Sequence, residues 1–179
     1  VRLALSHATN KNELIDKILS GNGMAIDSPM MPEIIAMPDS VDKYEFNIET
    51  AKKILEDAGW KLPASNSADL NLREKAAPPP KTKNQKPDEP LKLEIRLTTS
   101  DWPELVAVAD QIKKQWETIG ARVMVEILPL PELQQAIKSR EYDALLFGEV
   151  LALDPDPFSF WHSSQKRDPG LNLALYDNK

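Results

Sequence analysis

The sequence contains no cysteine, and this absence excludes disulfide bonds, thiolate metal sites and cysteine nucleophiles. Only two histidines are present, His7 and His162, and their separation offers no paired metal-ligand spacing. We therefore predict no metal centre and no cofactor.

Long apolar runs are also missing. No stretch approaches the ~20 apolar residues that a membrane-spanning helix needs. The 28 acidic residues outnumber the 22 basic ones and give a net charge of −6. This balance argues against nucleic acid or an anionic membrane surface as a partner, because both select basic protein surfaces.

Proline, by contrast, is abundant, with 15 residues in a chain of 179, a length typical of one domain. Five of these prolines lie in the stretch AAPPPKTKNQKPDEP. Such a composition buries too little apolar area to offset the entropy of ordering it. We expect residues 63–90 to form an extended surface insert, which acts as a spacer or, alternatively, docks into an aromatic groove of a partner.

The first third of the chain predicts three helices. Residues 1–8 form the first, and Asn10 caps the second, with Glu13 three places on to complete a capping box. Asn47 caps the third, which ends at Gly59.

The second half alternates strand and helix patterns. Apolar residues alternate over 91–97 and 123–127, and a third apolar run covers Ala144–Phe147. Residues 103–119 form an amphipathic helix, which an Asp101–Glu104 capping box would start, and a shorter helix follows Pro131. This order predicts an α/β fold with a mainly parallel βαβαβ sheet, in which ligands gather at the carboxyl ends of the strands.

The candidate binding residues follow from that topology. The segment 142–164 contains the last predicted strand and the loop that follows it, which carries acidic, aromatic and hydroxyl side chains. Residues that follow the first strand, and residues near the C-terminus, can lie beside this loop. The candidates are Asp154, Asp156, Trp161, His162, Trp102, Asn172 and Tyr176. All of them except His162 have a structural alternative: the aspartates stabilise a proline turn, the tryptophans pack in the core, and Asn172 and Tyr176 stabilise a hinge.

A catalytic interpretation is not favoured. His162 and Ser163 are adjacent, but neighbouring residues of an extended segment point apart, and no G-x-S-x-G nucleophile elbow is present. We predict that the chain is not an enzyme.

Six stretches together resemble a known family. They are VRLALSHATNKNELIDKILSG, YEFNIETAKKILEDAGW, residues 91–128, YDALLFG, DPDPFSFWHSS and NLALYDN. In order and approximate spacing they are similar to the second lobe of family 5 extracytoplasmic solute-binding proteins, the peptide, dipeptide and nickel receptors of ABC importers. The resemblance implies a three-layer lobe of the type II periplasmic-binding-protein-like fold, with N-terminal helices before the sheet.

The same resemblance implies a function for residues 1–179 as one lobe of a two-lobed monomeric receptor, whose first lobe and C-terminal return segment lie outside this sequence. Such a receptor is extracytoplasmic, is often a lipoprotein, and captures an oligopeptide or similar small solute for a membrane permease. The sequence departs from the family at Glu149, where many members have Trp, and at Leu153, where peptide-binding members have an Asp that pairs with the peptide amino terminus. The solute class therefore stays open, and a stand-alone flavodoxin-like domain that docks a protein partner is the alternative.

Overall fold

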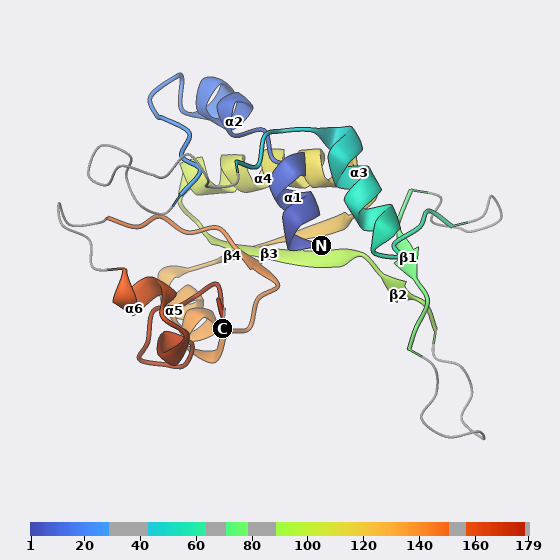
Figure 1. Cartoon of the computed structure of the whole chain (residues 1–179). Coiled ribbons are helices and arrows are strands. Elements are labelled where there is room, and N and C mark those ends of the chain that lie inside the picture. Colours follow the sequence, from blue (N-terminus) through green and yellow to red (C-terminus); the bar gives the residue numbers. More distant parts are fainter. Residues whose placement is uncertain (29–42, 64–70, 79–88, 151–156, 178–179) are drawn as a thin grey trace.

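The computed structural model describes residues 1–28, 43–63, 71–78, 89–150 and 157–177. A three-stranded parallel sheet forms the middle layer of the fold. Helices α1 (Arg2–Ala8), α3 (Ile48–Asp57) and α4 (Pro103–Glu117) cover one face, and α5 (Leu130–Ser139) covers the other (Figure 1). The predicted α/β class and three-layer arrangement are confirmed.

The sheet has the order β4-β3-β5, with β3 (Glu94–Ser100) in the centre. Strand β4 (Arg122–Leu128) pairs with β3 along its whole length, and β5 (Ala144–Leu145) pairs with Leu97 and Thr98 on the other side. The two crossovers therefore run in opposite directions, and their right-handedness places α4 and α5 on opposite faces.

The third strand is shorter than the sequence predicts. It ends at Leu145, although the Leu146 amide still donates to the Thr98 carbonyl at 2.9 Å. Phe147, expected as the last buried strand residue, is 47% exposed. The apolar run that predicted a buried strand therefore continues out of the sheet, beyond the cover of the helices.

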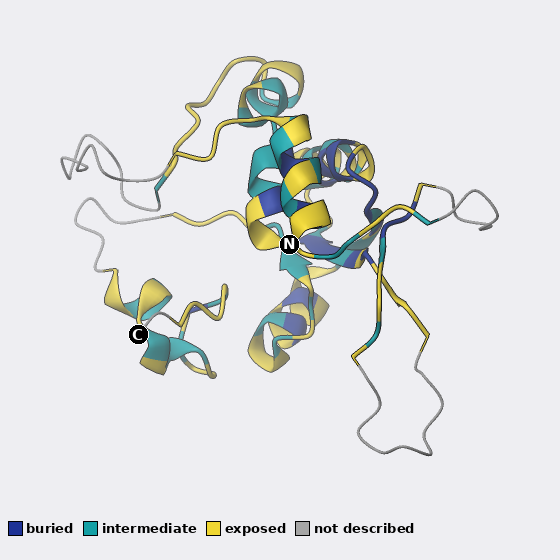
Figure 2. Cartoon of the chain, turned by 45° about the vertical axis from the view of Figure 1, so that its right-hand side comes forward, coloured by how far each residue is buried: buried dark blue, intermediate teal, exposed yellow. Residues whose placement is uncertain are grey.

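The core lies between the sheet and α4. Leu93, Leu97 and Val123 are almost completely buried, and the apolar stripe of α4 packs against them through Ile112 and Trp116. The helical spacing at 103–119 and the alternation at Leu93–Leu97 thus identify the buried faces correctly, but Leu91, the first residue of the alternation, is 49% exposed. In Figure 2 the buried parts of the ribbon gather where the helices and the sheet meet.

Small residues let the N-terminal helices approach closely. Ala4, Ala8, Ala51 and Leu55 have no exposed surface, and they join α1 and α3 to the same core. Leu3 of α1, by contrast, is 43% exposed.

Helix α2 (Lys11–Ile18) begins differently from the prediction. The Asn10 side chain accepts from the Glu13 amide at 3.1 Å, as expected, but the Glu13 carboxylate does not return to the Asn10 amide. Gln115 of α4 accepts from that amide at 3.0 Å, and Glu13 accepts from the Gln115 side chain at 2.9 Å. The predicted capping box is wrong because α4 supplies the partner.

Of the two other predicted helix caps, one is present and one is absent. The Asn47 side chain accepts from the Thr50 amide at 2.9 Å and starts α3 as predicted. Helix α4 has Trp102 as its N-cap with no side-chain hydrogen bond, so the predicted Asp101–Glu104 box is absent. Pro103 lies at the first helical position, where its missing amide proton costs nothing.

A β-hairpin precedes the sheet and changes the interpretation of the proline-rich region. Strand β1 (Glu74–Lys75) pairs antiparallel with β2 (Leu91–Lys92), which leads directly into β3. Leu72 and Arg73 are 4% and 2% exposed, so this part of the predicted surface insert belongs to the core. Residues 64–70 and 79–88 lie outside the described part of the chain.

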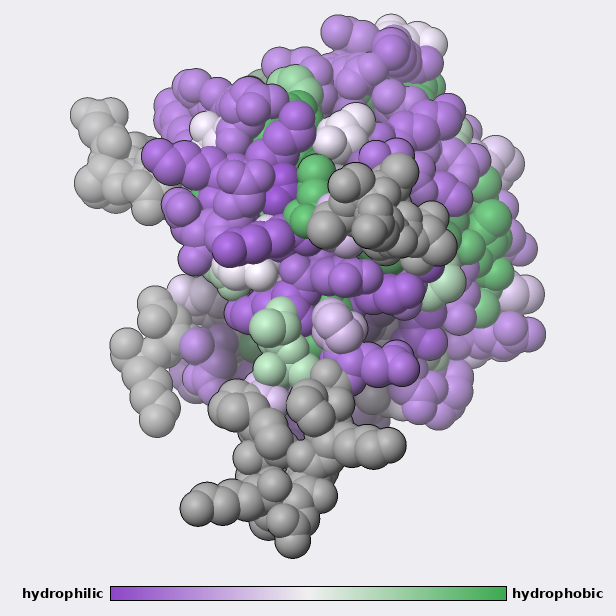
Figure 3. All heavy atoms as spheres, turned by 90° about the vertical axis from the view of Figure 1, so that its right-hand side faces the viewer, coloured by the Kyte–Doolittle hydropathy of each residue, from purple (hydrophilic) through white to green (hydrophobic). Residues whose placement is uncertain are grey.

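Arg73 attaches the hairpin to the rest of the fold. Its guanidinium donates to the carbonyls of Ile119 and Trp60 at 2.7 and 2.9 Å, and it forms an ion pair with Glu56 at 3.1 Å. The hairpin enters at the amino end of β3, and Figure 3, which views the molecule from this side, shows a mostly hydrophilic face. The exposed apolar side chains discussed below lie at the other end of the strands.

Candidate functional site

The three parallel strands end at one side of the sheet, the left side of Figure 1. We call the residues that follow them, 100–102, 129–130 and 147–149, the carboxyl edge. Three large apolar side chains there are strongly exposed: Trp102 at 64%, Leu130 at 58% and Phe147 at 47%. Exposed apolar groups gathered at one edge are typical of a binding or interface surface.

The strand order reverses at β3, because the first crossover leads to β4 and the second leads to β5 on the other side. In open α/β sheets, ligands bind in the crevice at the carboxyl ends of strands beside such a reversal. The topology alone therefore places a candidate site where the sequence predicted one.

Two buried threonines fix the strand ends at this point. The Thr99 hydroxyl donates to the Leu146 carbonyl at 3.0 Å, which ties β3 to the segment after β5. The Thr98 hydroxyl donates to the Glu126 carboxylate at 2.8 Å, which ties β3 to β4. Neither threonine has exposed surface, although the Glu126 side chain that accepts from Thr98 is 34% exposed.

The C-terminal segment 157–177 packs against α5 and the segment before β5. It carries α6 (Phe158–Trp161) and a short 3₁₀ helix, η1 (Ser163–Gln165). The Arg140 guanidinium donates to the carbonyls of Lys166 and Gly170, and the Tyr142 hydroxyl donates to the Leu173 carbonyl at 2.8 Å. These bonds hold the segment beside β5.

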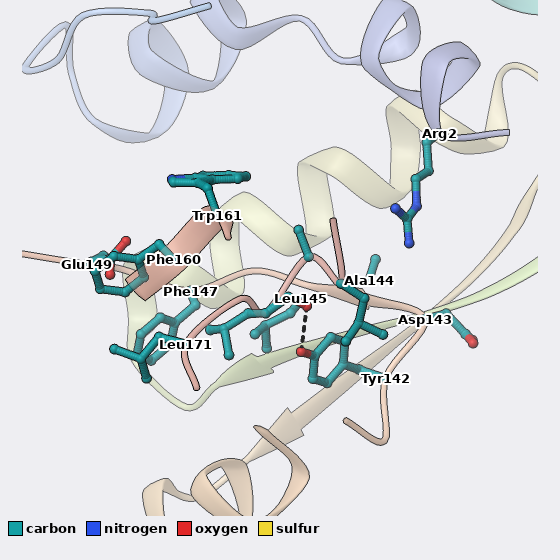
Figure 4. Close-up of a pocket in the computed structure, with 13 residues that line it drawn as sticks. Arg2, Tyr142, Asp143, Ala144, Leu145, Phe147, Glu149, Phe160, Trp161 and Leu171 are labelled. Carbon is teal, nitrogen blue, oxygen red and sulfur yellow. Dashed lines mark hydrogen bonds between the residues drawn. The ribbon is translucent and has the colours of Figure 1, made fainter. Parts of the chain in front are cut away.

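A cavity of about 410 Å³ lies between β5 and this C-terminal segment (Figure 4). Its volume falls within the range of small-molecule sites. Most of its lining is apolar, with charged groups at Arg2, Asp143 and Glu149 and a phenol at Tyr142. The other lining residues are Ala144, Leu145, Phe147, Phe160, Trp161, Leu171, Leu173, Ala174 and Leu175.

Two titratable groups of the cavity are perturbed by burial. Burial raises the pKa of the Tyr142 phenol, so the hydroxyl remains a neutral donor to Leu173. Partial burial also raises the pKa of the Glu149 carboxyl, although the residue as a whole remains exposed. In both cases the neighbouring protein replaces water that would stabilise the charged form.

Of the predicted binding residues, Trp161 lines the cavity and is 40% exposed. Trp102 is exposed at the carboxyl edge but does not line the cavity. The two tryptophans are therefore available to a ligand from separate surfaces, and neither is packed in the core.

His162 takes part in a local cap. Its ring stacks on Phe158 with centroids 4.5 Å apart, and its Nδ1 accepts from the Ser164 amide at 3.2 Å and contacts the Ser164 hydroxyl at 2.8 Å. A nucleophile and a base at this distance resemble part of a catalytic pair. The backbone amide, however, already occupies the Nδ1 lone pair, so the contact starts η1.

Hydrogen bonds join Asn172 and Tyr176 to each other within the C-terminal segment. Asn172 has no exposed surface, and its amide group donates to the carbonyls of His162 and Tyr176 while its oxygen accepts from the Tyr176 amide. The Tyr176 ring is exposed but does not line the cavity. Asp154 and Asp156 lie outside the described residues, and their ligand roles stay predictions.

The structure adds residues that the sequence analysis did not select. Arg2, Glu149 and Phe160 line the cavity, and Phe147 joins them instead of closing the core. The sequence did offer a signal for Glu149, because many members of the family that the sequence resembles have Trp at this position. Arg2 carried none, since it reaches the cavity from more than 100 residues away in the sequence, and Phe160 carried none, since its position depends on the return of residues 157–177 to β5.

Within the described ranges, no three His, Cys, Asp or Glu side chains are grouped so that they could hold a metal ion. In the same part of the chain, no helix has the length and apolarity to cross a membrane.

The fold defines a class: it is an α/β lobe of the periplasmic-binding-protein-like type. Comparison with protein families makes the assignment specific, since residues 1–170 match the middle region of the bacterial extracellular solute-binding proteins, family 5. The chain belongs to this family, as its resemblance predicted.

Individual relatives agree. The chain is 29% identical over 187 residues to the oligopeptide-binding protein AppA of Bacillus subtilis, covering 99% of this chain and 30% of AppA. It is 28% identical over 166 residues to the nickel-binding periplasmic protein of Escherichia coli, covering 91% of this chain and 28% of that protein. These relatives are solute-binding proteins, not enzymes.

Solved structures show the same fold. AppA in complex with a nonapeptide superposes with a TM-score of 0.80 at 26% identity, over 99% of this chain and 32% of AppA. NikZ from Campylobacter jejuni in complex with Ni(L-His) gives 0.77 at 24% identity, over 99% of this chain and 33% of NikZ. The chain thus spans about a third of the length of the relatives it matches.

Proposed function

We propose that this chain is one lobe of an extracytoplasmic receptor that captures an oligopeptide or similar small solute and delivers it to the membrane permease of an ABC importer. The observation that carries the proposal is the exposed apolar carboxyl edge. It belongs to a chain whose residues 1–170 match the solute-binding family. The family match gives no support to the alternative, a stand-alone docking domain.

The mechanism is capture between two surfaces. The carboxyl edge and the adjoining cavity offer one set of contacts, and a second lobe of the longer protein offers the other. A solute that touches both lobes stabilises the closed state, because only that state provides both sets of contacts. The exposed rings of Trp102 and Phe147 lose water when the lobes close, which adds apolar stabilisation.

The names of the relatives guide the solute class. AppA is an oligopeptide-binding protein, and the match to it covers 99% of this chain. The cavity supports a peptide-sized solute, since apolar side chains predominate and a few charged groups lie at its margins.

Isothermal titration calorimetry tests the proposal. The full-length receptor should bind short peptides with a dissociation constant of about 1 μM, whereas the isolated chain 1–179 should bind at least about 100-fold more weakly, since it provides only half of the contacts. Native mass spectrometry of receptor purified from its host would identify a co-purified solute.

Micromolar binding by the isolated chain would contradict capture between lobes. A full-length protein that binds no solute of any class would reject the receptor function.

A further inference from the structure

We propose that the outer edge of β4 pairs with the same strand of a second copy of this chain, so that two sheets join into one around a two-fold axis at Met124. The proposed receptor function does not use this surface, and the resemblance to solute-binding proteins implies a monomer instead. Edge strands carry unpaired backbone groups, which makes them templates for pairing with another chain.

Strand β4 is an unprotected edge. Among the strands that the structure describes, it ends the sheet of order β4-β3-β5, and it lies behind β3 in Figure 1. It runs for seven residues and pairs with β3 at every position, so no bulge bends it away. It also contains no proline and no lysine. Short length, bulges, proline and lysine are the usual features that prevent edge strands from pairing with another chain.

The outward backbone groups of β4 lie at alternate residues. The Arg122 amide donates to the Leu93 carbonyl at 2.9 Å, so Arg122 and every second residue after it face β3. The N–H and C=O groups of Val123 and Val125 therefore point away from the sheet. Within the described ranges, no hydrogen bond reaches these groups. In an antiparallel pair centred on Met124, Val123 would exchange both bonds with Val125 of the second copy.

The sequence of β4 is complementary to itself in this register. Arg122 would lie opposite Glu126 of the second copy, and Met124 would lie opposite its own counterpart. Opposite charges directly across an antiparallel pair stabilise it, whereas like charges destabilise it. Moving the axis to Arg122 or to Glu126 would place like charges opposite each other. The two charges therefore favour the register centred on Met124.

The side chains of this edge are accessible to a second copy. Met124 is 53% exposed, and the Arg122 and Glu126 side chains are 43% and 34% exposed. Arg122 already forms an ion pair with Glu94 of β3 at 2.8 Å. Across the joined sheet the order would be Glu94, Arg122 and then Glu126 of the second copy, so the charges alternate. Contact between the two Met124 side chains would add apolar stabilisation.

Sedimentation velocity of the full-length receptor tests the proposal. We expect a reversible dimer with a dissociation constant of about 10 μM, because a single strand pair buries a small interface. Met124→Lys should weaken dimerisation by at least about tenfold, because two like charges would meet at the axis. Met24→Lys is the matched control, since Met24 is 62% exposed downstream of α2 and should leave the dimer intact.

Two further variants locate the contact. Val125→Pro removes an outward amide that β3 does not use, so the chain should fold and the dimer should be lost. Met124→Cys should give a disulfide-linked dimer on mild oxidation, because Cα atoms at such a pair lie about 4.5 Å apart, within disulfide range. Residues 1–179 contain no cysteine, and peptide mapping would identify the bond in the full-length receptor. Thermal melts check that all variants fold.

A receptor that stays monomeric at about 100 μM would overturn the proposal. Equal dimerisation of Met124→Lys and Met24→Lys would overturn it as well, and so would a dimer that Met124→Cys fails to cross-link. Solute binding is measured separately and does not depend on the β4 edge, so these outcomes leave the receptor function standing.

Discussion

The Arg73 side chain joins the hairpin to the core, and Gly120 makes its position possible. Gly120 adopts φ +86°, and a Cβ built there would lie 2.7 Å from Arg73 Cγ and 3.1 Å from the Asn71 carbonyl oxygen. The Arg73 amide also donates to the Gly120 carbonyl at 2.8 Å. The backbone conformation and the close approach together require glycine.

Replacing Gly120 by alanine should lower the free energy of unfolding by about 3 kcal/mol or more, because left-handed strain and the clash with Arg73 add. Gly21→Ala is the matched control, since Gly21 has φ +77° but no atom within 4 Å of the built Cβ. It should cost only about 1 kcal/mol. Urea denaturation measures both, and equal losses would show that the contact with Arg73 is unimportant.

Residue-scale partners were the hardest to predict from the sequence. The Asn10 and Asn47 caps are confirmed because the amides they accept from lie three residues away. The Glu13 side chain turns instead to Gln115, 102 residues further along the chain. No local pattern contains such a partner, so the expected capping box was wrong.

Element-scale prediction succeeded where periodicity is strong. The alternation in β3 and the stripe of α4 report which faces are buried, and both are local properties of the sequence. In β4 the alternation holds for Val123, which is 2% exposed, but not for Ile127, which is 46% exposed near the end of the strand. Strand β5 was predicted too long, because an apolar run does not reveal where its neighbours stop covering it. The hairpin at residues 74–92 was missed because proline-rich composition concealed the short strand β1.

The link between β3 and β5 depends on Thr99. Thr99→Val removes the hydroxyl bond to the Leu146 carbonyl and should lower the free energy of unfolding by about 1–2 kcal/mol. It should also speed hydrogen exchange of the Leu146 amide, which bonds to the Thr98 carbonyl.

Thr98→Val is the matched control, because its hydroxyl bonds to Glu126 of β4 on the other side of β3. That variant should be destabilised similarly without faster exchange at Leu146. If both variants change the Leu146 amide equally, the side chains do not act on separate strand pairs.

At the scale of the whole molecule, the candidate site could be predicted only by its position. Topology placed it at the carboxyl edge, and the structure keeps Trp102 and Trp161 accessible there and in the adjoining cavity. The cavity itself depends on residues 157–177 returning to β5, held by Arg140 and Tyr142. No periodic pattern indicates that return, so Glu149 and Phe160 were not selected.

Closure of the full-length receptor should be visible in solution. Addition of a bound peptide should decrease the radius of gyration measured by small-angle X-ray scattering, because the solute favours the state in which both lobes touch it. A radius of gyration unchanged at saturating peptide would contradict closure.

The hairpin of β1 and β2 enters at the amino end of β3, remote from the carboxyl edge. A fluorescent protein inserted between Pro78 and Glu89 would therefore leave the path of the solute open. With a second fluorophore on the other lobe, the same receptor would become an optical sensor whose energy transfer follows solute concentration.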